Sequence, residues 1–212
     1  MFLADCHTHS LCSPDSNASM LQMAQKAYEY GLHTLCLTDH CDLLSLEGSG
    51  LWDYDWTLCT GSGRGCWTPS VPGWTCPWGW SLAWAIVFPE ASEKILGEPG
   101  LDFVIGSCHN LDEAAGGRDF ICCPIDTLED CYRALDNYFQ SMLAMAASPC
   151  YDVVGHVIYP LRYMNGPMTP PAWTGIGIKS GRSFAWPFSR AGALRSIPGR
   201  GRRSGNGFPF CG

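Results

Sequence analysis

The sequence predicts an α/β fold in which strands and helices alternate around a parallel sheet. Short apolar runs typical of buried strands alternate with segments that have helical spacing. Histidines recur where the expected strands end, as is common at the site-bearing edge of such sheets. The chain has 212 residues, 46% of them hydrophobic, which is enough for one packed domain. Both an open sheet and a closed barrel fit this alternation.

The first forty residues are expected to supply a strand, a helix and a second strand. Residues 2–5 are mostly apolar and are followed by a polar loop, which favours a short strand. Residues 20–30 have the apolar spacing of a helix, with Asn17 or Ser19 as its N-cap. Residues 34–38 are mostly apolar, as expected for a strand buried in a parallel sheet.

The following part of the chain is expected to add two helices and two strands. Residues 89–96 predict a short helix, because a proline is favourable in the first turn. Residues 101–106 and 151–154 predict strands. The strongest helix is predicted over residues 127–147. Its apolar side is expected to contain Leu128, Tyr132, Leu135, Phe139 and Leu143.

Composition excludes several classes of protein. No run of eighteen apolar residues is present, so we expect no membrane span. The first residues lack the basic start and apolar stretch of a signal peptide. The 13 cysteines are irregularly spaced and odd in number. We therefore expect a cytoplasmic protein with free thiols.

Charge and tryptophan are distributed unevenly along the chain. Residues 1–162 hold all 20 acidic residues, whereas residues 163–212 hold none and are basic. Most of the 9 tryptophans lie between Trp52 and Trp84. Segments 57–87 and 167–212 show neither helical nor strand periodicity, so no regular element is expected in them.

Five of the 6 histidines lie at or just after expected strand ends, and His33, at a strand start, is the exception. Alone, each is typical of a surface or core residue, but together they predict a metal site. Imidazole combined with carboxylate suits Zn, Mn or Fe. The histidines are His7, His9, His40, His109 and His156, and the carboxylates near them are Asp5, Asp15, Asp39 and Asp42.

Four ordered motifs resemble the polymerase-and-histidinol-phosphatase (PHP) family. They are Asp-Cys-His-Thr-His-Ser at 5–10, Thr-Asp-His-Cys-Asp at 38–42, the run 102–110 that ends in Gly-Ser-Cys-His-Asn, and Gly-His at 155–156 with Tyr-Pro-Leu-Arg-Tyr at 159–163. The last two motifs resemble its histidinol-phosphatase branch. The resemblance covers residues 1–56 and 87–165.

The resemblance implies a distorted (β/α)7 TIM-like barrel with up to three divalent metals. It implies hydrolysis of L-histidinol phosphate to L-histidinol and phosphate, a step of histidine biosynthesis. Arg162 would face the substrate phosphate, although an ion-paired or surface arginine is the alternative reading. The implied metal ligands are His7 with His9, Asp15 with His40, and His109 with His156.

The chain departs from the family pattern where its composition is unusual. The resemblance also implies a Glu in a Gly-x-Glu strand near residues 70–86, which contain no acid. It further implies an Asp and a His in a Ser-Asp-x-His motif beyond residue 165, where neither occurs. Without these ligands we expect an incomplete barrel and weak or absent activity.

Translation out of frame would explain both odd segments. With suitable codons, skipping two bases turns residues 78–85 into Gly-Leu-Glu-Leu-Gly-Met-Gly and residues 193–199 into Ile-Glu-Val-Asn-Thr-Trp. We therefore expect a PHP metallophosphatase domain at 1–165 with an aberrant insert at 57–87. A basic tail rich in Gly, Arg and Pro would follow at 166–212.

Three other functions remain open at this point. The chain could hydrolyse a nucleotide or another phosphate ester, or it could be a non-catalytic remnant that keeps some metal. Clustered arginines in the tail could bind nucleic acid, but a solvated tail explains them better. We expect a small phosphate ester as partner, and neither a membrane nor nucleic acid. The arginines of the tail are Arg195, Arg200, Arg202 and Arg203.

Overall fold

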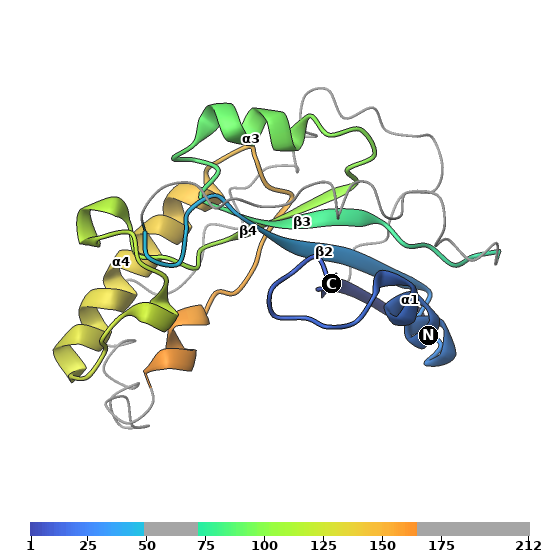
Figure 1. The fold of residues 1–212 in the computed structure, drawn as a ribbon, viewed down its shortest axis with the longest axis horizontal. Helices are drawn as coiled ribbons and strands as arrows, with labels where there is room; N and C mark the ends of the chain where they lie inside the picture. Colours follow the sequence, from blue (N-terminus) through green and yellow to red (C-terminus); the bar gives the residue numbers. More distant parts are fainter. Residues whose placement is uncertain (49–71, 165–212) are drawn as a thin grey trace.

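A computed structural model of the chain describes residues 1–48 and 72–164. Their five strands form one parallel sheet in the order β1-β2-β3-β4-β5, so order in space equals order in sequence. The sheet is curved and strongly twisted, with helices packed against it (Figure 1). Within the described residues this is an α/β fold with the architecture of an incomplete TIM-like barrel. The strands are β1 (Ala4–Thr8), β2 (Thr34–Asp42), β3 (Trp78–Ala83), β4 (Phe103–Ser107) and β5 (Val153–Val154).

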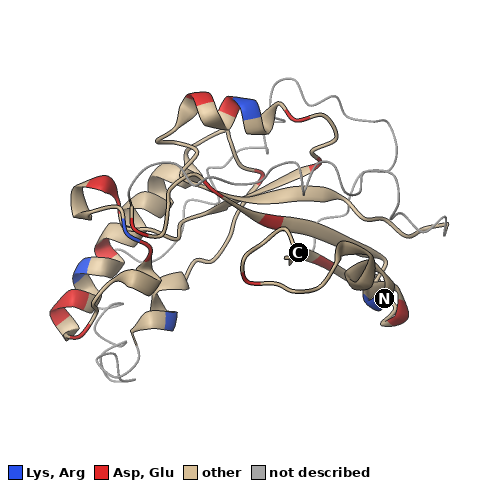
Figure 2. Ribbon diagram, in the orientation of Figure 1, with Lys and Arg blue, Asp and Glu red and all other residues tan. Residues whose placement is uncertain are grey.

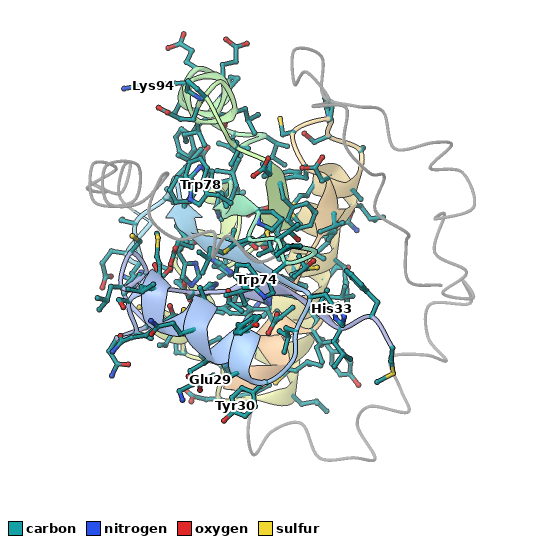
Figure 3. The ribbon with its side chains drawn as sticks, turned by 90° about the vertical axis from the view of Figure 1, so that its right-hand side faces the viewer. Glu29, Tyr30, His33, Trp74, Trp78 and Lys94 are labelled. Carbon is teal, nitrogen blue, oxygen red and sulfur yellow. The ribbon has the colours of Figure 1, made fainter. Side chains whose placement is uncertain are left out.

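The first helix, α1 (Met20–Glu29), begins where the sequence predicts. Ser19 is its N-cap, and Ser19 and Gln22 form a reciprocal capping box. Met20, Ala24 and Ala27 are buried against Leu35 and Leu37 of β2 and against Trp74. Figure 3 shows Trp74 among these side chains, whereas Glu29 and Tyr30 lie at the exposed end of the helix.

Helix α3 (Pro89–Leu96) has the bounds that the sequence predicts and covers the middle of the sheet. Its Ile95 belongs to a buried cluster with Cys41 of β2, Trp80 and Leu82 of β3, and Val104 of β4. Because α1 and α3 both contact the odd-numbered side of β2, they cover the same face of the sheet. The opposite face carries polar side chains toward the carboxyl ends of β2 and β3, among them His40 and Ser81.

Helix α4 (Leu128–Ala146) is capped by Thr127, but it buries a different side from the one expected. Leu128 and Leu143 are 42% and 46% exposed, so the predicted apolar stripe is wrong at these two positions. The buried side combines aromatic, aliphatic and sulfur-containing side chains, which pack in one cluster with Cys108 and Phe120. The buried residues are Cys131, Ala134, Leu135, Tyr138, Met142 and Met145.

Strand β3 corrects the expectation that segment 57–87 contains no regular element. Residues 78–83 pair with β2 on one side and β4 on the other. Trp80 and Leu82 fill the helix-covered core, and Gly79, Ser81 and Ala83 alternate with them. The origin of 57–87 and 167–212 in a shifted reading frame stays a prediction, which sequencing the gene would test.

Three short 3₁₀ segments complete the described fold: η1 (Glu113–Ala115), η2 (Phe120–Cys122) and η3 (Tyr159–Tyr163). Asp and Glu outnumber Lys and Arg over the described surface (Figure 2). No helix in the described ranges is long and apolar enough to cross a membrane. The predicted basic tail at 166–212, with its arginines, lies outside the described residues.

Candidate metal centre

Successive side chains of β2 point alternately into the core and toward the site. Leu35, Leu37 and Cys41 point into the helix-covered core. The side chains of His40 and Asp42 emerge on the other face, at the carboxyl end of the strand. In parallel α/β folds this end of the sheet is where sites form.

The five histidines of the sequence pattern meet at this edge. Their rings form a closed circuit in which each ring neighbours two others. Chain segments up to 149 residues apart therefore converge on one small volume. The ring-centroid distances are 4.9 Å for His7–His9, 4.4 Å for His9–His40, 4.9 Å for His40–His109, 5.6 Å for His109–His156 and 4.8 Å for His156–His7.

Asp15 joins two of these histidines from the loop after β1. Its carboxylate oxygens lie 2.9 and 3.0 Å from Nδ1 of His9, and Oδ2 lies 3.5 Å from Nε2 of His40. Nε2 of His9 is buried and has no hydrogen-bond partner among the described residues. A buried imidazole nitrogen without a partner is costly in a finished core, but it is expected of a metal ligand.

Asp42 lies between His40 and His109. Its Oδ1 accepts a hydrogen bond from Nδ1 of His109 at 2.9 Å, and its Oδ2 is 3.2 Å from Nδ1 of His40. Burial alone would raise the pKa of Asp42, but interactions with His109 and His40 outweigh it and hold this pKa well below its usual range. Burial lowers the pKa of His40, yet Asp42 and Asp15 more than compensate and raise it.

His7 and His156 face each other with their Nε2 atoms 2.9 Å apart. Burial, followed by the neighbouring histidines, lowers the pKa of His7 to about 4 and that of His156 to about 3. Both rings are therefore neutral near pH 7, which is the form that binds a metal. Nδ1 of His7 is held by the hydroxyl of Thr38 at 2.7 Å.

The backbone at His156 is held in a conformation that side chains rarely adopt. Its φ is 55°, in the left-handed region, and the hydroxyl of Tyr138 donates to its carbonyl oxygen. Such a conformation costs free energy and persists where the surroundings impose it, often at functional sites. Helix α4, which carries Tyr138, thus helps to aim the imidazole that follows β5.

Asp39 fixes the loop that carries His9 and Asp15 onto β2. It is fully buried and accepts hydrogen bonds from the backbone N–H of Ser10 at 2.5 Å, from Ser10 Oγ at 2.9 Å and from Ser13 Oγ at 2.7 Å. Ser13 Oγ in turn accepts from the N–H of His40 at 2.9 Å. This carboxylate therefore acts within the scaffold, because both of its oxygens accept hydrogen bonds from the loop.

Aromatic side chains from η3 form one wall of the site. The ring of Tyr159 lies 4.9 Å from that of His109 and 6.0 Å from that of His156. Its hydroxyl donates to Asp119 at 3.4 Å and receives a hydrogen bond from Tyr163 at 3.0 Å. Arg162 is exposed, and its guanidinium carbon lies 5.8 Å from the centroid of Tyr159. Arg162 is thus at the rim of the site.

The structure brings together His7, His9, Asp15, His40, His109 and His156, with Arg162 at the rim. Two groups have donor atoms close enough to share an ion, namely His9–Asp15–His40 and His40–Asp42–His109. The division into three ligand pairs, with His7 and His9 on one metal, stays a prediction. Sequence reasoning did not assign roles to Thr38, Asp42 or Tyr159. Asp42 was among the carboxylates expected near the histidines, and the His-x-Asp spacing places it on the face of His40, because residues two apart on a strand share a face.

These donors fit a divalent transition metal. Neutral imidazoles and carboxylates are the ligands preferred by Zn, Mn and Fe. Strand β3 contributes no carboxylate here, since the residue beside His40 is Ser81, whose hydroxyl pairs with that of Ser107 at 2.7 Å. The described site is therefore rich in imidazole and contains few carboxylates.

A curved parallel sheet with such a cluster at its carboxyl edge defines a metal-binding protein of the α/β-barrel type. A sequence profile of the PHP domain matches residues 5–176, so the chain belongs to the PHP family of metal-dependent phosphoesterases. A comparison with curated proteins found no match.

Two solved structures share the fold. Histidinol phosphate phosphatase (HisK) from Lactococcus lactis subsp. lactis Il1403, complexed with Zn, L-histidinol and phosphate, is 21% identical with a TM-score of 0.53, covering 76% of this chain and 59% of its own. The putative histidinol phosphatase HisK from Listeria monocytogenes is 17% identical with a TM-score of 0.55, covering 76% and 69%. The chain thus spans less than two thirds of the length of the Lactococcus protein.

Proposed function

We propose that this protein is a metal-dependent phosphomonoesterase that hydrolyses L-histidinol phosphate to L-histidinol and phosphate. The observation that carries the proposal is the closed circuit of five imidazoles, with Asp15, at the carboxyl edge of the sheet. Membership of the PHP family supports phosphoester hydrolysis. The substrate is proposed because the Lactococcus structure, which shares the fold, contains L-histidinol and phosphate.

We assign two roles to the side chains of the site: some would hold the metal, and others would orient the substrate phosphate. His7, His9, Asp15, His40, His109 and His156 would hold the metal, in the pairs that the family resemblance implies. Bound divalent ions would supply hydroxide near neutral pH and offset charge on the phosphoryl oxygens. Arg162, at the rim, has a planar fork of N–H donors that can grip two phosphate oxygens. Tyr159 would exclude water from the side of His109 and His156.

The test is phosphate release by purified protein loaded separately with Zn, Mn or Fe. L-histidinol phosphate, a nucleoside monophosphate and p-nitrophenyl phosphate would be compared as substrates. We expect release from L-histidinol phosphate, at a lower rate than that of a relative with a carboxylate on the corresponding strand, because β3 offers Ser81 there. His40→Ala should abolish release, whereas His33→Ala, outside the cluster, should not.

The presence of Ser81 on β3, where a carboxylate would offset metal charge, favours one second candidate: a metal-binding protein that does not turn over a substrate. A centre of mostly neutral ligands leaves more positive charge on its ions and binds them less firmly. Bound metal together with no release from any ester would establish this candidate and reject hydrolysis. Faster release from the nucleotide would instead reject L-histidinol phosphate as the substrate.

A further inference from the structure

Asp42 is the last residue of β2 and is placed to act on two imidazoles at once. It follows His40 by two positions, so both side chains leave the strand on the same face. Its carboxylate contacts His109, which follows β4, at 2.9 Å and His40 at 3.2 Å. The side chain is only 10% exposed, so water competes little for these contacts.

In both contacts the nitrogen that faces the carboxylate is Nδ1. Nδ1 of His109 donates a hydrogen bond to this carboxylate, whereas Nδ1 of His40 lies 3.2 Å from it without hydrogen-bond geometry. The negative charge of Asp42 favours the proton of each ring on the nitrogen that faces it, which leaves the lone pair on Nε2. For His40 the direction of Nε2 is visible in the structure, because this atom lies 3.5 Å from Asp15 Oδ2. His40 therefore spans two carboxylates, with Nδ1 toward Asp42 and Nε2 toward the group of His9 and Asp15.

We propose that Asp42 is a positioning residue that holds His40 and His109 with Nδ1 protonated, so that Nε2 of each ring is presented to metal. Asp42 is not itself a ligand in this arrangement. The inference rests on the metal site of the proposed function and assigns a role to a carboxylate outside its ligand pairs. One side chain thereby couples imidazoles carried by β2 and by the segment after β4, which are separated by β3.

The chemistry of this arrangement also explains why a single carboxylate suffices. Each of its two oxygens faces one ring: Oδ1 accepts the hydrogen bond of His109, and Oδ2 lies 3.2 Å from Nδ1 of His40 as a close charged neighbour. An asparagine of the same shape offers one acceptor oxygen and one N–H donor group. It can face only one of the two Nδ1 atoms with an acceptor and must present a donor to the other. Asp42→Asn is therefore an isosteric change that reverses one contact.

The experiment compares the unmodified protein, Asp42→Asn and the control Asp136→Asn, which changes an exposed carboxylate on α4. Titration with Co²⁺ alone, without substrate, gives the affinity and the visible spectrum at saturation. We expect Asp42→Asn to weaken Co²⁺ binding about 10- to 100-fold, as is typical when a partner of a ligating histidine is lost. The spectrum at saturation should be unchanged, and the control should match the unmodified protein.

Two results would overturn the proposal. Unchanged Co²⁺ affinity would mean that Asp42 does not orient the ligands. A changed spectrum at saturation would mean that Asp42 is itself a ligand. Because no substrate is present, either result is distinguishable from failure of the phosphatase assignment, which concerns phosphate release.

A second measurement does not depend on the folding of a variant. Nitrogen-15 NMR of the histidine rings in the unmodified metal-free protein, near neutral pH, reports which nitrogen carries the proton. We expect His40 and His109 to be protonated at Nδ1. Protonation of either neutral ring at Nε2 alone would contradict the proposal directly.

Discussion

Asp39 and His40 are adjacent in the sequence but act in different places, because the strand turns them to opposite faces. Asp39 is buried among the hydroxyl and backbone groups of Ser10 and Ser13, where it ties the first loop to β2. His40 faces the other histidines. The order of residues in the Asp-His pair therefore decides which one reaches the site and which one supports it.

Replacing Asp39 by Asn should destabilise the fold and loosen the first loop. The variant loses the charge that strengthens three hydrogen bonds, and hydrogen bonds to a charged group contribute about 1.5–3 kcal/mol each. Because serine hydroxyls can rotate to accept from the new amide, we expect a total loss of about 1–3 kcal/mol. Chemical denaturation measures the loss, and Asp126→Asn, at an exposed position, is the control. A variant as stable as the parent would contradict this role.

Among the elements, β3 is held close to β4 by the absence of a side chain at Gly79. A Cβ built at Gly79 would lie 2.2 Å from the backbone oxygen of Phe103, closer than atoms approach. Trp80 and Leu82 can then fill the core on the helix side while the backbones stay paired. The absence of a side chain at Gly79 therefore allows the large side chains of Trp80 and Leu82 to pack beside it.

Gly79→Ala should push β3 away from β4 and weaken the centre of the sheet. Overpacking costs about 1–3 kcal/mol, and more is expected here because the clash is with backbone. Gly97→Ala is the matched control, since Gly97 has an ordinary helical φ of −79° at the end of α3. Thermal unfolding of both variants, followed by circular dichroism, would measure the difference. Equal stability of the two would show that β3 and β4 do not approach as described.

Sequence reasoning located elements well where local chemistry marks them. Pro89 and the Ser19 cap signal helix starts, and the structure begins both helices there. Strand β3 was missed because its tryptophans and glycine resemble a loop when its neighbours are unknown. The exposed Leu128 and Leu143 were mispredicted for the same reason: tertiary packing, which local sequence does not reveal, decides which side of a helix is buried.

For the site, sequence reasoning found the histidines because they recur at strand ends. It did not find the contacts of Asp42 with His40 and His109, since the register of strands separated by β3 sets them. Nor could it distinguish the scaffold carboxylate Asp39 from a ligand. These distinctions depend on which face of a strand a residue occupies, and local composition does not determine that.

The molecule as a whole contains a cluster of partly buried imidazoles whose protonation opposes folding. His7, His9 and His156 have pKa values lowered by burial, to about 4 for His7 and about 3 for His156, from 6.5. As pH falls below 6.5, the unfolded chain takes up protons that the folded chain does not. The contribution of these three histidines to the free energy of unfolding is thus fully present above pH 6.5 and is lost as the pH falls toward 4. His40, with its raised pKa, acts in the opposite direction.

We therefore expect the unfolding midpoint of metal-free protein to fall as the pH is lowered from 7.5 to 5. Thermal scans in the presence of a chelator would measure it. His7→Gln, which removes one of the titrating groups, should reduce the dependence on pH. A midpoint that stays constant or rises over this interval would contradict the pKa values of the cluster.

The sheet adds its strands in the order in which the ribosome makes them, each beside the one before. Pairing can then proceed as the chain emerges, without waiting for a distant segment. The ring of imidazoles behaves differently, because His7 must wait for His156 before the circuit closes. Metal loading at the complete centre would thus be a late event in biogenesis, and a nascent chain released before residue 156 would lack the complete centre.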